Sequence, residues 1–457
     1  MKQVEVTWEG FRGFKKPTSI ALPQLTLLIG RNNVGKTSAY APLLMLRQTL
    51  DARDPNTGLL SRGSLIDAGP FRDYVSDHDT TKSILFSITV PEPPEIKLKG
   101  GTQRVARIEV GFGSPDGQTT VLTRQRIIDG EGKPLVTRTR NAGGEPFDVR
   151  SRLLPSSAPV GRPPREKTLL REAIREEQPE GFLIDGFGAL IVPRQIRTDK
   201  ERWTKVQDWY NAAYELFEVQ HAANAAVRQL LMGLSYVGPL RSLPLRTYRL
   251  AAEAPIDVGS SGELAPEVLF RLHEDDTGSI VSDWLRRLGY GNLRFEHFGD
   301  EYFQVKFETS GGVRVNIADS GVGLSQVLPL LVQGVMADRG GTLIAQQPEI
   351  HLNPAQQSIV TDFLIDCAMR GIRVVIETHS EHVLLRLRRR IAEAAIQHSE
   401  VAVYYVDNIQ GETQVRRVEL GDAGEIERSD WPIGFFEDQL ADSFALARAQ
   451  AERAGVK

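Results

Sequence analysis

Cysteine is almost missing from this sequence. Its 457 residues include one cysteine, Cys367, so an intramolecular disulfide is excluded. The first residues, Met1–Val4, lack the apolar segment of a secretory signal, and no apolar run approaches the ~18 residues that span a bilayer. These absences predict a cytoplasmic protein without membrane contact, and they exclude a transporter that carries its own membrane half.

The sequence also lacks a strong charge of either sign. Lys and Arg number 55 and Asp and Glu number 59, which gives a formal net charge of -4. Bulk charge therefore gives no reason to expect tight nucleic-acid binding, although a local basic patch stays open. No long heptad array is present, which argues against an extended coiled-coil arm. Hydrophobic residues make up 41% of the chain, enough for a large folded core.

Hydrophobic patterning divides the chain into three predicted regions. Residues 1–82 carry short strands and a glycine-rich turn. Residues 83–234 contain alternating segments between Pro- and Gly-rich turns, which predict an antiparallel sheet, and then helical spacing. Together they predict an inserted β-rich and helical lobe. A flexible stretch is expected near 141–180. Residues 235–457 alternate short buried strands with helices, among them a helix predicted over Pro354–Met369. This is the pattern of a parallel sheet flanked by helices.

Residues 30–37 read Gly-Arg-Asn-Asn-Val-Gly-Lys-Thr, a complete P-loop motif. It lies between an apolar strand, Leu25–Ile29, and a segment of helical spacing, Thr37–Leu50. Backbone N–H groups of such a loop face phosphate oxygens, while Lys36 supplies positive charge and the Thr37 hydroxyl ligates Mg²⁺. A chance glycine-rich turn is the alternative. ATP and Mg²⁺ are the predicted cofactors, and the predicted nucleotide-binding residues are Gly30, Asn32, Asn33, Val34, Gly35, Lys36, Thr37 and Ser38.

A second small-residue segment, Asp319–Gln326, precedes a predicted helix that begins at Val327 with Pro329 in its first turn. Such a helix start can bind an anion through free N–H groups and the helix dipole. An ordinary Gly- and Ser-rich helix cap is the alternative. The candidate anion-binding residues are Ser320, Gly321, Gly323, Ser325 and Gln326.

The apolar strand Thr342–Ala345 is followed by two glutamines, Gln346 and Gln347. A Mg²⁺-ordering acid and a water-polarising acid are expected at the end of such a strand. Glutamine keeps the reach of glutamate but has no negative charge, so it neither attracts Mg²⁺ strongly nor acts as a base. Hydrolysis is therefore expected to be slow or absent. Glu349 is a nearby carboxylate, but its place after a proline favours a turn.

A histidine, His379, follows the apolar strand Arg373–Glu377 and is positioned to sense a γ-phosphate. A lone histidine at a strand end is more often a solvated or capping residue, but the order of the preceding motifs favours sensing. Gln346, Gln347 and His379 are therefore the candidate catalytic residues. Thr37 and Gln346 are the candidate metal positions.

In this order, the segments resemble the ABC-type ATPases of the SMC-like and overcoming-lysogenization-defect (OLD) group of bacteria, and within it compact ATPases without a fused Toprim nuclease. The resemblance implies an α/β fold: an ABC-type P-loop nucleotide-binding fold with a mixed sheet flanked by helices, plus the inserted lobe. It covers most of the chain. Further segments that carry it are Phe11–Phe14, Tyr236–Arg241, Gly259–Glu263, Trp284–Leu285 and Trp431–Phe436.

The resemblance implies a homodimer or higher homo-oligomer that pairs head to tail. Gly30–Thr37 of one copy would bind ATP, and Ser320–Gln326 of a second copy would close on its γ-phosphate. His379 would be the switch histidine. His351 and Asn353 would lie in the segment that communicates across the dimer.

Two further points depend on the resemblance. Arg12 would lie near the adenine or the α-phosphate. Family members usually carry an acid in at least one of the two glutamine positions, so two explanations stay open. Either an engineered replacement of glutamate stands at Gln346 or Gln347, or the chain is a natural ATPase that uses ATP as a structural ligand.

Three functions are open. The first is an ATP-dependent regulatory or clamping subunit that controls a separately encoded effector, a nuclease candidate, in a setting of anti-phage defence implied by the resemblance. The acids of a Toprim nuclease are missing from Val401–Lys457. The second is a DNA-clamping repair or recombination ATPase, in which the arginines of residues 386–390 contact phosphate, although a solvated helix face is the commoner role of such a cluster. The third, a transporter ATPase with a separate membrane subunit, fits the motifs less well.

Overall fold

The chain forms two compact units in the computed structural model. One contains Leu22–Thr37 and Leu234–Lys457, and we call it the P-loop unit. The other contains Lys2–Ala21 and Ser38–Gly233, and we call it the insert unit. The predicted division at residues 82 and 234 stays a prediction. The structure describes residues 3–141, 147–155, 165–184, 198, 200–309, 311–427, 445–446 and 450.

The P-loop unit is built on a six-stranded sheet in the order β10-β15-β16-β3-β17-β18. Its first five strands run parallel and β18 is antiparallel to β17. Every residue of β3, β15 and β16 is buried, as expected for parallel strands under helices. The strands are β3 (Leu25–Ile29), β10 (Leu234–Val237), β15 (Thr342–Gln346), β16 (Arg373–Glu377), β17 (Val401–Ile409) and β18 (Glu412–Val418).

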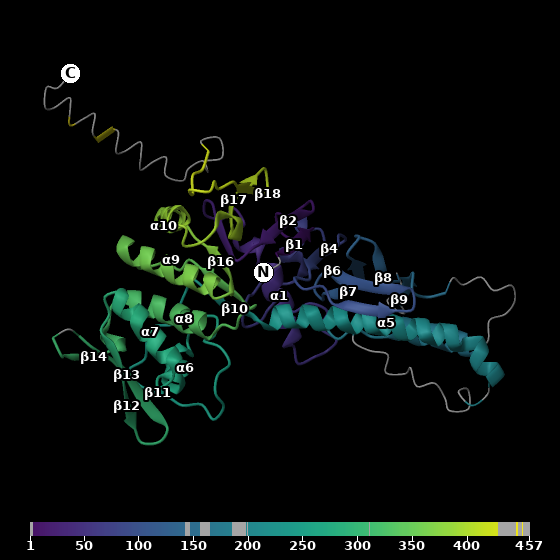
Figure 1. The fold of residues 1–457 in the computed structure, drawn as a ribbon, viewed down its shortest axis with the longest axis horizontal. Helices are drawn as coiled ribbons and strands as arrows, with labels where there is room; N and C mark the ends of the chain where they lie inside the picture. Colours follow the sequence, from purple (N-terminus) through teal and green to yellow (C-terminus); the bar gives the residue numbers. More distant parts are fainter. Residues whose placement is uncertain are drawn as a thin grey trace. The chain divides into compact units, whose positions relative to one another are not determined.

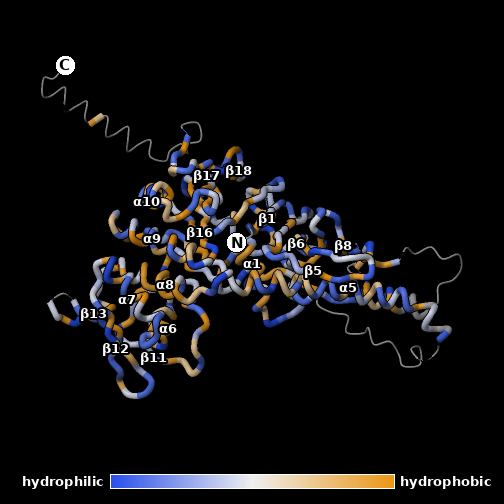
Figure 2. The backbone as a smooth tube through the Cα atoms, viewed as in Figure 1, coloured by the Kyte–Doolittle hydropathy of each residue, from blue (hydrophilic) through white to orange (hydrophobic). Residues whose placement is uncertain are grey.

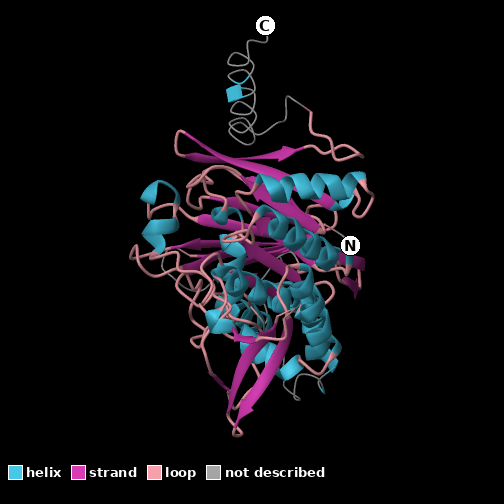
Figure 3. Ribbon diagram, turned by 90° about the vertical axis from the view of Figure 1, so that its left-hand side faces the viewer, coloured by secondary structure: helices cyan, strands magenta, loops and turns pink. Residues whose placement is uncertain are grey.

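Helices flank this sheet (Figures 1 and 3). Helix α8 packs on β10 and β15, and α9 packs on β16 and against α8 and α10. Figure 2 shows the apolar residues along α8. The helices are α6 (Ala265–Leu272), α7 (Asp276–Arg287), α8 (Val322–Met336), α9 (Pro354–Met369) and α10 (Glu381–Ala392), with short 3₁₀ turns at Ile317–Asp319 and His398–Glu400.

A smaller antiparallel sheet completes the P-loop unit. Its strand order is β11-β13-β12, and β14 also pairs with β13. Helices α6 and α7 pack against β11 and β12, respectively. The strands are β11 (Tyr248–Arg249), β12 (Asn292–Phe298), β13 (Tyr302–Glu308) and β14 (Arg314–Asn316).

Local sequence signals agree with the observed start of α9 but not with that of α8. Asn353 and Gln356 form a capping box at the start of α9, where Pro354 takes the first position, so the predicted helix over residues 354–369 is confirmed. The prediction that a helix begins at Val327 is wrong, because α8 begins at Val322 and Pro329 lies inside it. A proline in a helix removes one backbone hydrogen bond, and the burial of α8 offsets that loss.

The insert unit is built on an eight-stranded sheet in the order β2-β1-β4-β6-β7-β8-β9, with β5 paired to β6. The pairs from β1 to β9 are antiparallel, so the predicted antiparallel lobe is confirmed. The strands are β1 (Val4–Glu9), β2 (Thr18–Leu22), β4 (Ile84–Thr89), β5 (Glu95–Leu98), β6 (Gly101–Gly113), β7 (Val121–Asp129), β8 (Pro134–Arg140) and β9 (Phe147–Ser151).

Helices of the insert unit pack on this sheet and on each other. Helix α5 contacts β5, β6, α1 and α3, as the run of α5 along the strands in Figure 1 shows. Within 141–180, where a flexible stretch was expected, the structure contains β9 and α3, while 142–146 and 156–164 lie outside the described residues. The helices are α1 (Ala41–Leu50), α2 (Phe71–Tyr74), α3 (Arg165–Glu176) and α5 (Lys200–Met232), with 3₁₀ turns at Thr37–Ala39 and Ser76–His78.

The elements confirm the predicted fold class, α/β with a mixed sheet flanked by helices and an additional β-rich and helical lobe. In the described part of the chain, no helix combines the length and apolar character that crossing a membrane requires.

A buried ion pair joins β8 to the helices of the insert unit. Arg138 is 0% exposed, and its guanidinium donates to the Glu177 carboxylate at 2.6 Å, to the Ile174 carbonyl at 2.8 Å and to Gln220 Oε1 at 2.9 Å. Burial raises the pKa of Glu177 to about 7, and the charge of Arg138 opposes that rise. The packing of β8 against α3 and α5 therefore depends on the hydrogen bonds of one guanidinium.

Arg138→Met is expected to lower the free energy of unfolding by about 3–5 kcal/mol, because it leaves the Glu177 carboxyl buried without its partner. Urea denaturation followed by circular dichroism measures this change. The matched control is Arg104→Met, because Arg104 pairs with Glu95 on an exposed surface and its loss should leave stability almost unchanged. Equal losses in the two variants would contradict the importance of the buried pair.

Candidate functional site

The P-loop follows β3 at the edge of the sheet where β15 and β16 also end. β16 lies between the other two strands, so Glu377 pairs in register with Leu28 on one side and with Gln346 on the other. The carboxyl ends of parallel strands share one edge of the sheet. The predicted P-loop, Gln346 and a carboxylate that sequence reasoning did not select therefore meet there.

Two positions of the P-loop require glycine because of their backbone angles and their close contacts with the β17–β18 hairpin. Gly30 and Gly35 have φ values of +147° and +102°, which strain any other residue. A Cβ at Gly30 would lie 2.2 Å from the Val406 carbonyl oxygen, and one at Gly35 would lie 2.8 Å from Thr413 Oγ1. The β17–β18 hairpin therefore fixes the path of the loop.

The predicted asparagines and valine of the loop differ in exposure. Asn32 and Asn33 are exposed, and Asn33 has a left-handed φ of +63°. Val34 is buried, and its carbonyl accepts a hydrogen bond from Thr413 Oγ1 at 3.4 Å. Exposed loop backbone next to an anchored valine fits a phosphate-binding turn.

Lys36 is held inside the loop. It is 4% exposed, and its Nζ donates to the carbonyls of Gly30 at 3.0 Å and Arg31 at 2.5 Å. Burial lowers the pKa of Lys36, while the charges of Glu377 and Glu349 oppose that shift. The loop therefore presents a cation that two nearby carboxylates stabilise.

Thr37 is the centre of a hydrogen-bond network. Its Oγ1 donates to the Glu377 carboxylate, with distances of 2.9 and 3.2 Å to the two oxygens. Gln346 Nε2 donates to the same Oγ1 at 3.2 Å, and Gln346 Oε1 accepts from the Tyr236 hydroxyl at 2.5 Å. Four side chains from the P-loop, β16, β15 and β10 are thereby joined.

The Thr37 hydroxyl oxygen, which is hydrogen-bonded to the Glu377 carboxylate, fits a Mg²⁺ ion. Mg²⁺ prefers oxygen ligands and is usually bound through one or two side chains together with phosphate oxygens. Across the described ranges, no group of three or more His, Cys, Asp or Glu side chains is arranged to hold a metal, so nucleotide phosphates would have to complete the set. Gln346, a predicted metal position, faces Thr37 with its amide nitrogen, which is not a Mg²⁺ ligand.

Gln347 lies in the turn that follows β15. Its φ is +47°, and its N–H donates to the Glu377 carbonyl at 2.7 Å. The residue is half-buried. Its predicted catalytic role stays a prediction.

Glu349 lies in the turn after β15, as predicted, and its carboxylate contacts the predicted switch histidine. Its Oε1 accepts the backbone N–H of His379 at 2.9 Å, and a side-chain hydrogen bond from Thr378 also reaches the carboxylate. Burial raises the pKa of Glu349. Its Oε2 is buried and has no hydrogen-bond partner in the described part of the chain.

His379 lies within electrostatic reach of the P-loop. Burial lowers the pKa of His379, and the positive charge of Lys36 lowers it further. The imidazole is therefore neutral at neutral pH, when it can donate one hydrogen bond and accept another. Its predicted switch role stays a prediction.

The predicted anion-binding segment forms the start of α8. Gly321 is the N-cap, and no side chain caps the helix. The Ser320 hydroxyl donates to the Ile317 carbonyl at 2.6 Å, and the Ser325 hydroxyl donates to the Val322 carbonyl, also at 2.6 Å. Both hydroxyls are therefore engaged with nearby backbone, which leaves backbone N–H groups as the groups suited to an anion.

The other two residues of this segment pack inward. A Cβ at Gly323 would lie 3.0 Å from the Tyr290 hydroxyl oxygen. Gln326 is buried, and its Nε2 donates to Ser325 Oγ at 3.2 Å. The close approach of Tyr290 therefore favours glycine at position 323.

Arg241 links this segment to the glutamine strand, a role that sequence reasoning missed. Its Nη1 donates to the Gln326 carbonyl at 2.8 Å, and its Nη2 donates to the Gln346 carbonyl at 3.0 Å. Burial lowers the pKa of Arg241 to about 10, and the charge of Glu349 opposes that shift. The arginine stands in the segment Tyr236–Arg241, but its two backbone partners are about a hundred residues away, so no local pattern identifies them.

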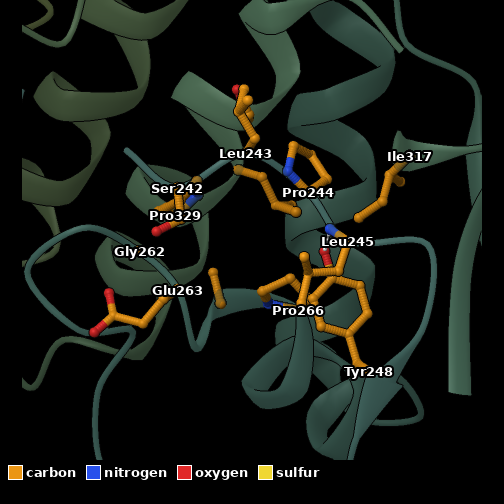
Figure 4. Close-up of a pocket in the computed structure, with 13 residues that line it drawn as sticks. Ser242, Leu243, Pro244, Leu245, Tyr248, Gly262, Glu263, Pro266, Ile317 and Pro329 are labelled. Carbon is orange, nitrogen blue, oxygen red and sulfur yellow. Dashed lines mark hydrogen bonds between the residues drawn. The ribbon is translucent and has the colours of Figure 1, made fainter. Parts of the chain in front are cut away.

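A partly apolar pocket of about 200 Å³ lies beside α8. Figure 4 shows its lining, with Leu243, Leu245 and Tyr248 opposite Pro329. Ser325 is the one predicted site residue in the lining. The pocket is therefore separate from the edge of the sheet where the P-loop begins.

Arg12 and Ser38 belong to the insert unit and contact each other. Arg12 Nη1 donates to Ser38 Oγ at 3.3 Å, and its guanidinium lies 5.4 Å from the centre of the Phe11 ring. Burial lowers the pKa of Arg12. Contacts of Arg12 and Ser38 with nucleotide stay predictions.

The remaining predicted residues have structural surroundings as well. His351 is exposed with a φ of +58°, and Asn353 caps α9. Their predicted role in communication across a dimer stays a prediction. The motif Trp431–Phe436 lies outside the described residues.

The basic cluster on α10 is largely neutralised by carboxylates. Arg386 and Arg390 both pair with Asp362, and Arg389 pairs with Glu393. Arg388 donates to the Gly424 carbonyl at 2.7 Å. These arginines are therefore poorly suited to neutralising nucleic-acid phosphates.

Glu349→Ala is expected to lower the free energy of unfolding by about 1–3 kcal/mol, because the His379 N–H loses its acceptor. Glu349→Gln keeps an acceptor oxygen and should lose much less. Chemical denaturation of both variants tests this. An equal loss in the two would show that the charge, and not the hydrogen bond, anchors the segment.

Two family models match the chain. Residues 25–386 match the family model described as "AAA domain, putative AbiEii toxin, Type IV TA system". Residues 396–446 match a model described as "Protein of unknown function (DUF3696)". No curated protein matches the chain.

Among solved structures, the chain is similar to an Smc head bound to the C-terminal winged-helix domain of ScpA, at 13% identity with a TM-score of 0.40, covering 93% of this chain and 99% of that one. An SMC head domain from Thermotoga maritima matches at 10% identity with a TM-score of 0.37, covering 92% and 100%. Likenesses this weak assign no functional residue.

The family model spans most of the chain and includes the P-loop, both glutamines and His379. The chain therefore belongs to the family described as "AAA domain, putative AbiEii toxin, Type IV TA system", and it is a protein of the nucleotide-binding ATPase class.

Proposed function

We propose that this chain is an ABC-type ATPase subunit of the SMC-like and OLD kind, in which bound ATP and Mg²⁺ pair two copies head to tail. Pairing would control a separately encoded effector. The observation that carries the proposal is the joining of the P-loop residue Thr37 to Glu377 and Gln346 at one edge of the sheet. This arrangement holds the groups of the loop in fixed positions, which lowers the cost of ordering them around a nucleotide.

Each residue of the edge has a defined part in this proposal. Lys36 would neutralise charge on the terminal phosphates, and Thr37 would contribute an oxygen to the cation. Mg²⁺, when bound, would neutralise further phosphate charge. His379, neutral and close to Lys36, would contact the γ-phosphate.

Head-to-tail pairing is supported by the exposure of the P-loop and of the start of α8. Asn32 and Asn33 of the P-loop are exposed, as are Gly321 and Val322 at the start of α8. A phosphate bound by one copy would meet the uncapped N–H groups of α8 from the second. Arg241 would transmit a movement of α8 to the end of β15, because it binds both the Gln326 and the Gln346 carbonyls.

The proposal also includes an effector partner and a setting in bacterial defence. The family description names a putative toxin of a toxin–antitoxin system, which supports a nucleotide-controlled effector in bacterial defence, with a nuclease as candidate partner. The alternative, a DNA-clamping ATPase, is less favoured because the arginines of α10 are bound by Asp362 and Glu393.

Addition of ATP with Mg²⁺ is expected to double the molar mass of the protein in multi-angle light scattering. Lys36→Ala should abolish the shift, because it removes the cation that binds the phosphates. Lys133→Ala is the control, since Lys133 is an exposed lysine paired with Glu131, and it should behave as the unchanged protein. A dimer that forms equally without ATP would contradict nucleotide-driven pairing.

Gln347→Glu is expected to raise the rate of phosphate release by about 100-fold or more, the usual contribution of a positioned general base. Gln346→Glu should raise it less, because its carboxylate would be next to that of Glu377 and the two charges repel. A colorimetric phosphate assay compares the two variants. The reverse order would place the water-polarising position at residue 346.

A further inference from the structure

The acid missing from the end of β15 has a counterpart one strand away. Glu377 ends β16, directly in register with Gln346. It is 4% exposed, and both oxygens of its carboxylate lie within 3.2 Å of Thr37 Oγ1. A buried carboxylate thus faces the hydroxyl that a P-loop offers to Mg²⁺.

We propose that Glu377 is the residue that positions Thr37 for the Mg²⁺ of bound ATP, in place of an acid at position 346. The inference rests on the proposed nucleotide binding and names the carboxylate on which its metal dependence relies. Glu377 acts here as a positioning residue, through the hydroxyl of Thr37.

The hydrogen bonds of Thr37 assign the orientation of its hydroxyl. A threonine hydroxyl has one proton to donate and two lone pairs to accept with. The Thr37 hydroxyl donates its proton to the Glu377 carboxylate. Gln346 Nε2 donates to one lone pair. Within the described part of the chain no other donor takes the second lone pair, which is available to a cation.

Gln346 is fitted to stand beside this carboxylate. Its amide nitrogen donates to Thr37 and its amide oxygen accepts from Tyr236, so both ends of the amide are satisfied. A glutamate there would lose the donation to Thr37 and would place a second negative charge against Glu377 in a buried site, which is costly without a cation. The glutamine therefore complements a carboxylate that is supplied by β16.

The positive charge nearby favours the same assignment. Glu377 acts electrostatically on Lys36 and opposes the loss of its charge. The carboxylate therefore has both the P-loop cation and the Thr37 hydroxyl as neighbours. A metal ion bound with the phosphates would enter a site that already contains a negative charge.

The test separates metal dependence from nucleotide binding. Affinity for a fluorescent N-methylanthraniloyl-ATP is measured by titration in MgCl₂ and again in EDTA, for the unchanged chain, Glu377→Gln and the control Asp366→Asn, whose carboxylate is half-exposed on α9. Electron paramagnetic resonance of Mn²⁺ with the same nucleotide gives a second readout that does not depend on hydrolysis.

The unchanged chain and the control should bind more tightly in Mg²⁺ than in EDTA. Glu377→Gln should lose about 10- to 100-fold of the metal-dependent affinity, the usual effect of removing a group that orients a metal ligand, while its affinity in EDTA stays unchanged. If Glu377→Gln keeps the full metal enhancement, the inference is overturned and the proposed function stands. If the unchanged chain binds no nucleotide in either buffer, the proposed function itself fails.

Glu377→Gln is central in a buried sheet, so its folding must be checked by circular dichroism. If it does not fold, the exchange variant Gln346→Glu with Glu377→Gln decides, since it keeps one carboxylate and one amide across the same register pair. Recovered metal enhancement in the exchange variant supports the need for a carboxylate beside Thr37. Nucleotide binding without any metal enhancement in it overturns the inference.

Discussion

The Thr37 hydroxyl is the atom on which the arrangement of the P-loop edge depends. It joins the loop to Glu377 on β16 and to Gln346 on β15, and Tyr236 on β10 binds the far end of that glutamine. Leaving a buried donor or acceptor unpaired costs about 1–3 kcal/mol. Each strand end is therefore restrained by the hydrogen-bonding needs of its neighbours, and the P-loop is restrained with them.

The charges around this hydroxyl balance in pairs. Lys36 and Arg241 are buried cations, and Glu377 and Glu349 are the carboxylates that stabilise them. Removing one member leaves an uncompensated buried charge, which costs more than the pair contributes. The balance also explains why position 346 accommodates an amide, since a further carboxylate would disturb it.

Arg241 gives the site a physical link between its two motifs. It binds the backbone carbonyl of Gln326 on α8 and that of Gln346 at the end of β15. A shift of α8 would therefore act directly on the end of β15, which bears Gln346. Carbonyl groups are present at every residue, so this link does not depend on which side chains the two segments carry.

The sequence by itself determined several strands and helices of the P-loop unit and the P-loop motif. Periodicity located β3, β15, α9 and β16, and the P-loop spacing placed Lys36 and Thr37, because hydrophobic period and glycine turns are local properties. The predicted helix start at Val327 is wrong, because Pro329 lies inside α8 and not in its first turn.

Only the tertiary structure decided the partners. No acid stands at the end of β15 in the sequence, and Glu377 reaches Thr37 from β16, the strand beside it. Glu349 lies in a turn, as its place after a proline predicts, but only the fold shows that its carboxylate binds the His379 backbone. Strand order and register bring such residues together, and these depend on how distant segments pack, which no local pattern contains.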